Sequence, residues 1–321
     1  MKAALVTIHP SQFPAAVRRD LLTSLRTCCL NHKFLYDSHR QTQKWLALHE
    51  AHSPARRDDE CLKIYDDAFV ATAQEISKKQ IHVLSLGCGG GQKDTRLLQL
   101  LQARGKKLSY TPCDVAAPMT LVACAAALKF LPPEKITPFV CDLATATDLP
   151  QCLDPRPSTL VTFFGMIPNF EPQRILPKLA ELVRSRDWLL FSANLAPGKN
   201  YAAGMKKILP QYDNALTRDW LFAFLHDLGV EPRAGKMKFT VERGGAGLQR
   251  IVARFHFTRA QSVQVGEEKF TFARGETMRL FFSYRYTLAL VEKNLARHGL
   301  QVCAHWLAAS EEEGVFLCQR G

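Results

Sequence analysis

The chain has 321 residues, a formal net charge of +12, 47% hydrophobic residues and 22% charged residues. These values are ordinary for a globular protein, and no apolar run approaches the roughly 20 residues that span a bilayer, which excludes a membrane-spanning chain. The length predicts one large domain or two interlocked ones. The first residues show no convincing signal-peptide core or cleavage site, so we expect a soluble, cytoplasmic protein.

The ten cysteines are scattered and include no C-x-x-C pair, the spacing typical of metal sites and redox motifs. Cys88, Cys113, Cys141 and Cys318 lie in or beside apolar runs, where cysteine behaves as a small hydrophobic residue. We therefore expect free thiols, no bound metal and a reducing compartment.

The positive charge is dispersed in short pairs such as Arg18-Arg19 and Lys206-Lys207. None of these pairs is interleaved with aromatic residues, as a stacking platform for single-stranded nucleic acid would be. We interpret the basic residues as a solvated surface, and we expect neither a nucleic-acid nor a membrane partner.

After an amphipathic helix over residues 15–30, helix and strand patterns alternate, as a doubly wound α/β sheet requires. Helices are predicted over residues 59–76, 95–101, 116–130 and 173–185, and strands over residues 81–86, 108–113, 136–141, 159–164 and 188–192.

The alternation stops near residue 196. The segment 196–282 is rich in lysine, arginine and aromatic residues and has strand-like stretches over 251–258 and 269–274. A helix over 288–298 and strands over 300–306 and 314–319 close the chain, and these two strands could pair as an antiparallel edge.

We predict an α/β fold in which a doubly wound, seven-stranded, Rossmann-like sheet has a smaller α+β lobe inserted into it. We assign the sheet domain to residues 58–195 plus 284–321. We assign a substrate-binding lobe to residues 1–57 plus 196–283.

A glycine-rich turn follows the first of these strands, where residues Ile81 to Asp94 are IHVLSLGCGGGQKD. Gly87, Gly89 and Gly91 have the spacing G-x-G-x-G. Glycines let the backbone approach a ligand closely, and the helix that follows presents free N–H groups. The stretch therefore predicts a ligand-binding turn.

Polar residues follow three later strands: Asp114, Asp142 and Asn169. In open α/β sheets the ligand lies over the carboxyl ends of the strands. Asp114 is placed to accept hydrogen bonds from ribose hydroxyls, and Asp142 from an adenine amino group. Neither a P-loop nor the G-x-G-x-x-G spacing is present. This favours S-adenosylmethionine, a nucleoside cofactor without a phosphate, and a seven-stranded methyltransferase sheet.

Six motifs follow one another along nearly the whole chain. They are KFLYD (33–37), LGCGGGQKDTRLL (86–98), PCDVA (112–116), GMIPNFEP (165–172), ILPQYDN (208–214) and GETMRLFFSYRY (275–286). In this order they resemble the S-adenosylmethionine-dependent histidine Nα-methyltransferases of ergothioneine biosynthesis and their relatives.

The resemblance implies which residues hold the cofactor and the substrate. For the cofactor it implies Gly87, Lys93 and Asp114, with Asp142 at adenine. For the substrate it implies Asn169 and Tyr212 at the α-carboxylate, Tyr36 beside the amine and Ser283 in the side-chain pocket.

The expected reaction is the attack of a neutral amine on the methyl group of the cofactor, with the protein contributing mainly alignment. Tyr36 is placed to orient the amine lone pair or to relay its proton. The backbone of Gly165, beside the transfer path, is placed to accept a hydrogen bond from the amine. These two are the candidate catalytic residues.

Three positions depart from the family pattern. Phe281 stands where the family has the glutamate that meets the imidazole, Ala253 where it has a methionine, and His52 where it has a second tyrosine ahead of a proline. A buried acid that pairs with an imidazole N–H gives discrimination that an apolar pocket cannot. We therefore expect methylation of an amino acid or related small amine, with histidine not necessarily preferred.

Two alternatives remain open. Ile167-Pro168-Asn169-Phe170 lies where nucleic-acid amino-methyltransferases have an Asn/Asp-Pro-Pro-aromatic loop, so a nucleic-acid or protein N-methyltransferase is one. A protein that binds S-adenosylmethionine without catalysis is the other. Under the favoured interpretation the protein is a monomer that binds a small-molecule substrate.

Overall fold

The large sheet of the computed structural model has eight strands, and the described residues are 5–53, 58–153 and 158–321. The strands are β1 (Thr7–Ile8), β2 (Gln80–Leu86), β3 (Lys107–Asp114), β4 (Phe139–Val140), β5 (Thr159–Phe163), β6 (Trp188–Asn194), β12 (Leu300–Leu307) and β13 (Glu313–Arg320). Their order is β1-β4-β3-β2-β5-β6-β13-β12, and all run in the same direction except β13, which pairs antiparallel with both β6 and β12. The predicted doubly wound α/β fold and the antiparallel pairing of the last two strands are confirmed.

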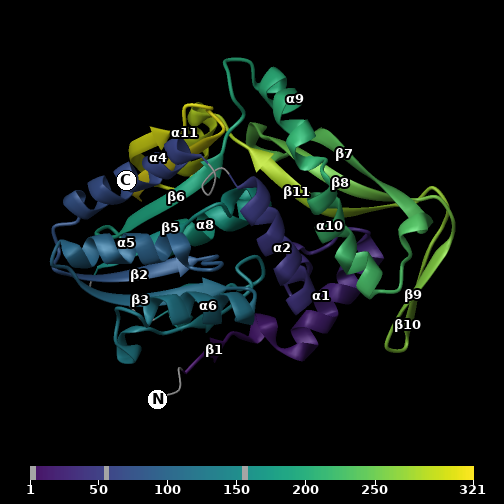
Figure 1. Ribbon diagram of the computed structural model, residues 1–321, viewed down its shortest axis with the longest axis horizontal. Helices are drawn as coiled ribbons and strands as arrows, with labels where there is room; N and C mark the ends of the chain where they lie inside the picture. The colour runs from purple at the N-terminus through teal and green to yellow at the C-terminus, as the bar shows by residue number, and fades with distance from the viewer. Residues whose placement is uncertain (1–4, 54–57, 154–157) are drawn as a thin grey trace.

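Helices cover both faces of this sheet, so its hydrophobic core has two layers (Figure 1). One face packs against α4 (Asp59–Glu75), α5 (Gln92–Ala103) and α6 (Ala117–Ala127), and the other against α8 (Pro172–Leu182) and α11 (Leu288–Ala296). Neighbouring strand residues point to opposite layers: Val83 packs in the first, and Leu84 and Leu86 in the second.

The strand order reverses between β2 and β5, and such a reversal opens a crevice at the carboxyl ends of the strands. The turn after β2 and the loop after β5 meet there. Met166 of the loop packs so close to Gly87 of the turn that a Cβ at Gly87 would lie 2.5 Å from its Cγ.

Two elements differ from the prediction. The strand expected over 136–141 is reduced to β4, because Pro138 has no N–H for a ladder, and Ile136 forms only an isolated bridge with Tyr110. An eighth strand, β1, pairs parallel with β4. A two-residue strand is too short to show alternation in the sequence.

A smaller antiparallel sheet in the order β11-β8-β7 lies on the right in Figure 1. This part of the chain comprises α9 (Tyr201–Tyr212), α10 (Ala215–Asp227), β7 (Gly235–Arg243), β8 (Gln249–Phe257), β9 (Gln261–Val265), β10 (Glu268–Phe272) and β11 (Thr277–Arg285). The predicted strands over 251–258 and 269–274 correspond to β8 and β10, whereas the remaining elements were not predicted.

The chain leaves the large sheet and returns to it at adjacent points. Leu195 and Tyr286 form a parallel bridge, and the Tyr286 N–H donates to the Asn194 carbonyl at 2.9 Å. The segment between them therefore has the form of an insertion. The division of the whole chain into two domains stays a prediction.

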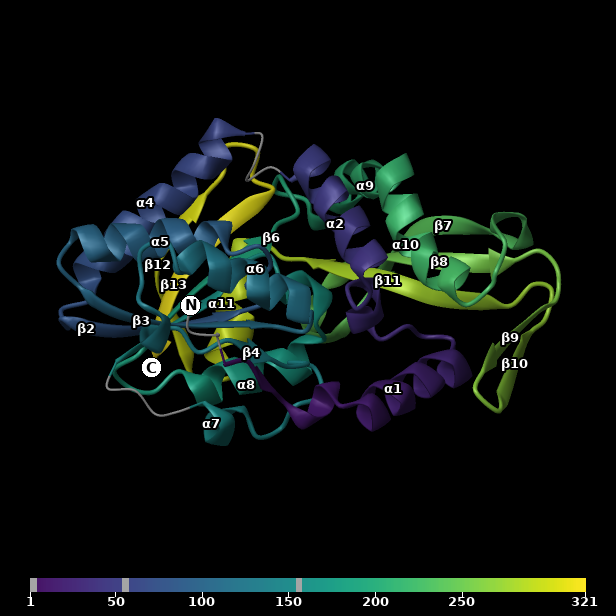
Figure 2. The same ribbon diagram turned by 60° about the horizontal axis from the view of Figure 1, so that its bottom comes forward.

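The N-terminal region forms α1 (Pro14–Thr27), the 3-10 helix η2 (His32–Leu35) and α2 (His39–His52). In both Figure 1 and Figure 2, α2 lies between the two sheets, and it packs against α10. This region therefore forms a wall between the carboxyl ends of the large sheet and the inserted segment.

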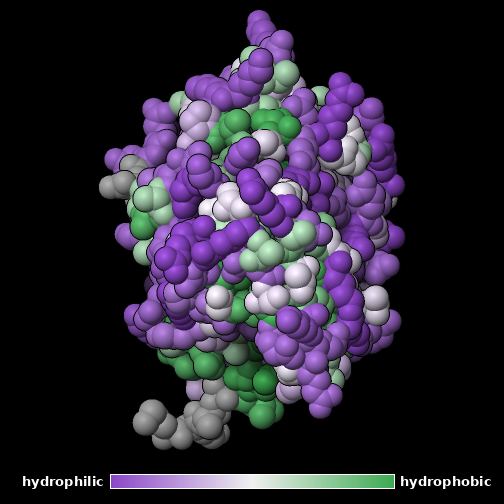
Figure 3. Space-filling model, turned by 90° about the vertical axis from the view of Figure 1, so that its right-hand side faces the viewer, coloured by the Kyte–Doolittle hydropathy of each residue, from purple (hydrophilic) through white to green (hydrophobic). Residues whose placement is uncertain are grey.

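The end of the molecule beyond the small sheet is mostly hydrophilic. Figure 3 shows it with smaller hydrophobic areas among the hydrophilic residues. Within the described ranges, no helix is both long enough and apolar enough to cross a bilayer.

Gly91 allows the turn to pack against the next helix of the same layer. Its φ is 73°, in the left-handed region, and a Cβ there would lie 2.8 Å from the Cα of Ala123 in α6. Any other residue would be strained and would also push α5 and α6 apart.

We predict that Gly91→Ala destabilises the protein more than Gly105→Ala. Gly105 has nearly the same φ, 75°, but a Cβ there meets no atom within 4 Å, so this control loses only about 1–2 kcal/mol to backbone strain. Overpacking against Ala123 adds about 1–3 kcal/mol in Gly91→Ala. Urea unfolding of the two variants measures the difference. Equal losses would mean that Ala123 leaves room for the added methyl group.

Candidate active site

A cavity of about 480 Å³ opens at the carboxyl ends of β2, β3 and β5, a size typical of small-molecule sites. Its walls come from the glycine turn, the loop after β5, η2 and α2. Seven of the predicted site residues line it: Tyr36, Gly87, Gly89, Lys93, Asp114, Gly165 and Asn169.

The carboxylate of Asp114 holds the glycine turn against the end of β3. The Gly89 N–H donates to its Oδ2 at 2.9 Å, and the Ala116 N–H donates to its Oδ1 at 3.0 Å. Burial raises the pKa of this carboxyl, while the amide hydrogen bonds act in the opposite direction. The Val115 amide also interacts with this carboxylate, and since a carboxylate has about four lone-pair sites, the group can still accept from a further donor, such as a ribose hydroxyl.

Lys93 lies in the first turn of α5 and brings positive charge to the cavity wall. Its Nζ donates to the Tyr65 hydroxyl at 2.6 Å and lies 3.9 Å from the centroid of that ring. Tyr65 in turn donates to the buried carboxylate of Glu313, which lies 3.9 Å from the Lys93 Nζ. The ammonium is therefore held where the cavity meets the helix N-terminus, a position suited to a carboxylate ligand.

Asp142 follows β4 and is buried, but it does not line the cavity. Its Oδ1 accepts from the Ala144 N–H at 2.9 Å. Its Oδ2 lies 3.4 Å from the Nζ of buried Lys33 and accepts no hydrogen bond within the described part of the chain. The predicted adenine acceptor thus has one oxygen without a hydrogen-bond donor.

Tyr36, Gly165 and Asn169, the residues expected around the methyl acceptor, share the cavity with the glycine turn. The Tyr36 ring contacts Trp45 and Trp220 at centroid distances of 5.8 and 5.7 Å. Burial, and secondarily the charge of Asp114, raise the pKa of the Tyr36 hydroxyl, so it stays protonated.

The loop after β5 has a fixed shape. The Gly165 N–H donates to the Ser192 Oγ at 2.8 Å, and the φ of Gly165 is 69°. A Cβ at this position would meet no atom within 4 Å, so the glycine leaves open space in the cavity wall.

Four other predicted substrate residues lie outside this cavity. The Tyr212 hydroxyl is 2.8 Å from the Ser283 Oγ and accepts from Arg285 Nη2 at 3.1 Å. Phe281 faces Ala253 across the β11–β8 pair, and both are buried in the core of the smaller lobe. Ala253 is therefore part of the core packing of the smaller lobe.

The two remaining predicted residues do not line the cavity either. His52 is exposed at the end of α2, and Pro54, the proline it precedes in the family comparison, lies outside the described residues. Gly91 serves the packing of α5 against α6.

Several cavity residues were missed in the sequence. His32, Trp45, His49, Val115, Met119, Phe164 and Met166 line it. Trp45 and His49 are four residues apart on α2, and their rings stack at 4.9 Å. That i, i+4 spacing was the available signal, since it puts both on one helix face.

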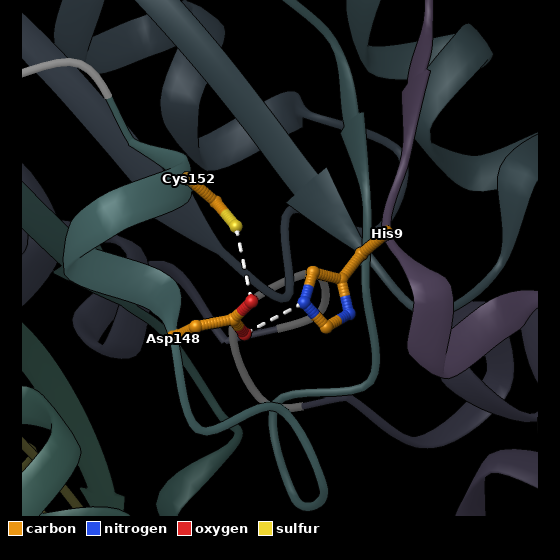
Figure 4. Close-up of side chains that lie close together, drawn as sticks. All are labelled: His9, Asp148 and Cys152. Atoms are coloured by element: carbon orange, nitrogen blue, oxygen red, sulfur yellow. Dashed lines mark hydrogen bonds and ion pairs between the residues drawn. The ribbon is translucent and has the colours of Figure 1, made fainter.

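One cluster of possible metal ligands occurs among the described residues: His9, Asp148 and Cys152, the last two from the α7 region (Leu149–Cys152) (Figure 4). The Ser11 N–H donates to His9 Nδ1 at 3.0 Å, so the ring proton is on Nε2, which donates to Asp148 at 2.8 Å. Because Nε2 has no lone pair in this tautomer, the cluster is better explained as a hydrogen-bonded tie between the N-terminal segment and α7.

The residues present fit S-adenosylmethionine. A carboxylate with free lone pairs lies at the end of β3, an ammonium lies at the start of α5, and the backbone of the glycine turn is open to the cavity between them. Asp114 would hold the ribose hydroxyls, and Lys93 with the α5 N-terminus would hold the amino-acid carboxylate of the cofactor.

We predict that Asp114→Asn weakens the binding of S-adenosylhomocysteine by at least about tenfold, because hydrogen bonds to a charged group contribute about 1.5–3 kcal/mol. Isothermal titration calorimetry measures the loss. Asp148→Asn, which changes a half-exposed carboxylate bonded to His9, is the control and should bind as the wild type does. Unchanged binding by a folded Asp114→Asn would show that Asp114 does not contact the ligand.

A family model described as "Histidine-specific methyltransferase, SAM-dependent" matches residues 17–320. No curated protein matches the chain with significance.

Solved structures of several methyltransferases are similar to this chain. Magnesium protoporphyrin IX methyltransferase (ChlM) from Synechocystis PCC 6803, with bound SAH, superposes with a TM-score of 0.50 at 12% identity, over 90% of this chain and 98% of that one. The CcbJ methyltransferase from Streptomyces caelestis has a TM-score of 0.41 at 12% identity, over 80% of this chain and 88% of that one. The glycopeptide N-methyltransferase MtfA, complexed with SAM, has a TM-score of 0.40 at 12% identity, over 80% of this chain and 94% of that one.

The comparison with ChlM, at its low identity, shows the fold alone, whereas the family model covers nearly the whole chain. The resemblance found in the sequence motifs is thereby confirmed. The chain belongs to the SAM-dependent, histidine-specific methyltransferase family: it is a methyltransferase, and its cofactor is S-adenosylmethionine.

Proposed function

We propose that the protein methylates the α-amino group of a free amino acid or of a closely related small amine. The observation that best supports this is the position of Asn169. Its side-chain amide lines the same cavity as the glycine turn and has no hydrogen-bond partner among the described residues. An amide NH₂ is a good donor to a carboxylate, so an amino acid can be held by its carboxylate with its amine inside the cavity.

Bound S-adenosylmethionine supplies an activated methyl group, and the protein has to orient a neutral amine toward it. Tyr36, kept protonated by its raised pKa, accepts a hydrogen bond from one amine N–H through its hydroxyl oxygen. The Gly165 carbonyl is the second acceptor. Two acceptors that engage the N–H groups leave the lone pair directed at the methyl group, and alignment of this kind lowers barriers by up to about 7–11 kcal/mol.

We further propose that histidine is not the preferred substrate. Phe281 stands where the family has its imidazole-binding glutamate, but it packs against Tyr212 and Trp220 at centroid distances of 6.1 and 5.7 Å and lies outside the cavity, so no carboxylate reaches an imidazole from that position. A buried imidazole without a partner loses about 1–3 kcal/mol relative to a hydrogen-bonded one. An aromatic or apolar side chain has no such loss.

In this arrangement Asn169 binds the carboxylate without Tyr212. The Tyr212 hydroxyl is engaged by Ser283 and Arg285, and the cavity does not reach it. The number of methyl groups transferred follows from how much room the amine keeps, and the open wall at Gly165 favours more than one transfer.

We also propose that the protein works in a reducing, cytoplasmic setting. All ten cysteines are free thiols, and five of them are buried in the core.

The test is a screen of free amino acids and their decarboxylated amines with methyl-labelled cofactor, analysed by mass spectrometry. We expect methylated amino acids, with apolar or aromatic ones ahead of histidine, and little product from the decarboxylated amines because Asn169 has no carboxylate to bind. Equal turnover of an amino acid and its decarboxylated amine would contradict the proposed role of Asn169. Histidine as the best substrate would contradict the proposed side-chain preference.

Asn169→Asp and Asn169→Ala form a matched pair for this screen. The aspartate repels the substrate carboxylate, whereas the alanine only removes a donor, so we expect a larger rise in KM for Asn169→Asp. Binding of S-adenosylhomocysteine should be unchanged in both, which separates a substrate effect from a folding defect.

A further inference from the structure

Tyr65 of α4 lies between a cation of the cavity wall and a buried acid. Its hydroxyl accepts from the Lys93 Nζ at 2.6 Å and donates to Oε1 of Glu313, the first residue of β13. Tyr65 itself is buried and does not line the cavity. Three elements, α4, α5 and β13, therefore meet at this one hydroxyl.

The Tyr65 hydroxyl is held in place by a full set of partners. Burial, and secondarily the charge of Glu313, raise its pKa, so it keeps its proton and donates it to that carboxylate. The Ser192 hydroxyl also interacts with it, and the Ser192 Oγ accepts from the Gly165 N–H at 2.8 Å. With Lys93 as a third partner, the orientation of the hydroxyl is fixed.

Glu313 is an acid within reach of the same cation. Its side chain is buried, its Oε2 accepts from the Cys61 thiol at 3.6 Å, and its Oε1 lies 3.9 Å from the Lys93 Nζ. A hydrogen-bonded ammonium–carboxylate pair is closer, at about 2.7–2.9 Å between nitrogen and oxygen. Because the Tyr65 hydroxyl is bonded to both groups, it keeps the two charges about one bond length further apart than such a pair.

This separation matters because Lys93 also faces the cavity. Its side chain is 28% exposed and lines the cavity wall. An ammonium has three N–H donors and can bond to Tyr65 and to a ligand carboxylate at the same time. A direct pair with Glu313 would instead neutralise the ammonium with a buried acid, where the attraction between opposite charges is strong. The ligand carboxylate would then lose its cation.

We propose that Tyr65 is a positioning residue for the cofactor: its hydroxyl keeps the Lys93 ammonium from pairing with Glu313, so that the ammonium can bind the amino-acid carboxylate of S-adenosylmethionine. Glu313 orients the hydroxyl and competes for Lys93 only when the hydroxyl is absent. The inference rests on the role given above to Lys93 and does not depend on which amine the protein methylates.

The experiment compares two ligands by isothermal titration calorimetry, with no methyl acceptor present. They are S-adenosylhomocysteine and its decarboxylated analogue, S-adenosyl-3-thiopropylamine, which lacks only the carboxylate. The wild type should bind the analogue at least about tenfold more weakly. Tyr65→Phe keeps the ring beside Phe69 and Phe164 but has no hydroxyl. It should bind S-adenosylhomocysteine about tenfold more weakly than the wild type, and the analogue with nearly unchanged affinity.

A second substitution tests the competition by the acid. The double variant Tyr65→Phe/Glu313→Gln has no carboxylate to compete for Lys93, so it should recover most of the affinity for S-adenosylhomocysteine, which closes a double-mutant cycle. Tyr284→Phe is the matched control. The Tyr284 hydroxyl accepts from Arg250 at 3.3 Å and donates to Glu171 at 2.6 Å, a similar arrangement that does not line the cavity. This variant should bind both ligands as the wild type does.

Four outcomes would overturn the proposal. One is a wild type that binds both ligands equally, a result that needs no variant to fold. Another is a Tyr65→Phe protein that loses the same affinity for both ligands, which would show a packing role only. The third is a double variant without recovery. The fourth uses Lys93→Gln: if this variant loses affinity for S-adenosylhomocysteine and Tyr65→Phe does not, the positioning role is wrong, whereas no loss in Lys93→Gln would remove Lys93 itself from the cofactor site.

Discussion

The hydrogen bond from the Gly89 N–H to the Asp114 carboxylate joins the ends of two neighbouring strands, and the geometry of the whole site depends on it. Burial of that carboxylate is unfavourable unless donors satisfy it, and the turn supplies one of them. The turn can do so only because its glycines accept a left-handed backbone. It then sets where α5 begins and so where Lys93 points. The cofactor half of the site is thus built on strand ends and a helix start, which are rigid parts of the fold.

The acceptor half has a different construction, in which aromatic rings form the boundary. Tyr36 contacts Trp220, whose Nε1–H donates to the Leu35 carbonyl at 2.9 Å, and Trp220 contacts Phe281. This row of rings joins the cavity to the core of the smaller lobe. The polar pair of Tyr212 and Ser283 lies outside the cavity and is satisfied by its own hydrogen bonds. The cofactor half thus keeps the residues of the family, whereas the region of Tyr212, Ser283 and Phe281 is packed and lies outside the cavity. Such a difference is compatible with one fold, because function depends on the residues of the site and not on the fold alone.

The cofactor half could be predicted from the sequence because its signals are local. Apolar strands followed by glycine or aspartate mark strand ends, and parallel strands bring those ends together, which correctly put Gly87, Asp114 and Asn169 around one cavity. The acceptor half depends on tertiary contacts. No local pattern shows that β11 has a bulge between Arg279 and Phe281, which shifts its register against β8. For the same reason the cavity residue His32 could not be identified from the sequence: it reaches the cavity only through the tertiary placement of η2.

The N-terminal segment contacts both sheets and so fixes the position of the cofactor half of the site relative to the acceptor half. Residues of β1 pair with β4 of the large sheet, and further along the Leu30 N–H donates to the Arg279 carbonyl of β11 at 2.9 Å. Between the sheets, Lys33 is buried with Asp20 at 2.6 Å and Asp142 at 3.4 Å. If Lys33 moved away from Asp20 or Asp142, a buried charge would be left uncompensated, so the three side chains tolerate little displacement relative to one another. Because η2 and its C-cap residue Tyr36 provide both this ammonium and two residues of the cavity wall, His32 and Tyr36, the cofactor pocket cannot shift without moving the wall of the acceptor site.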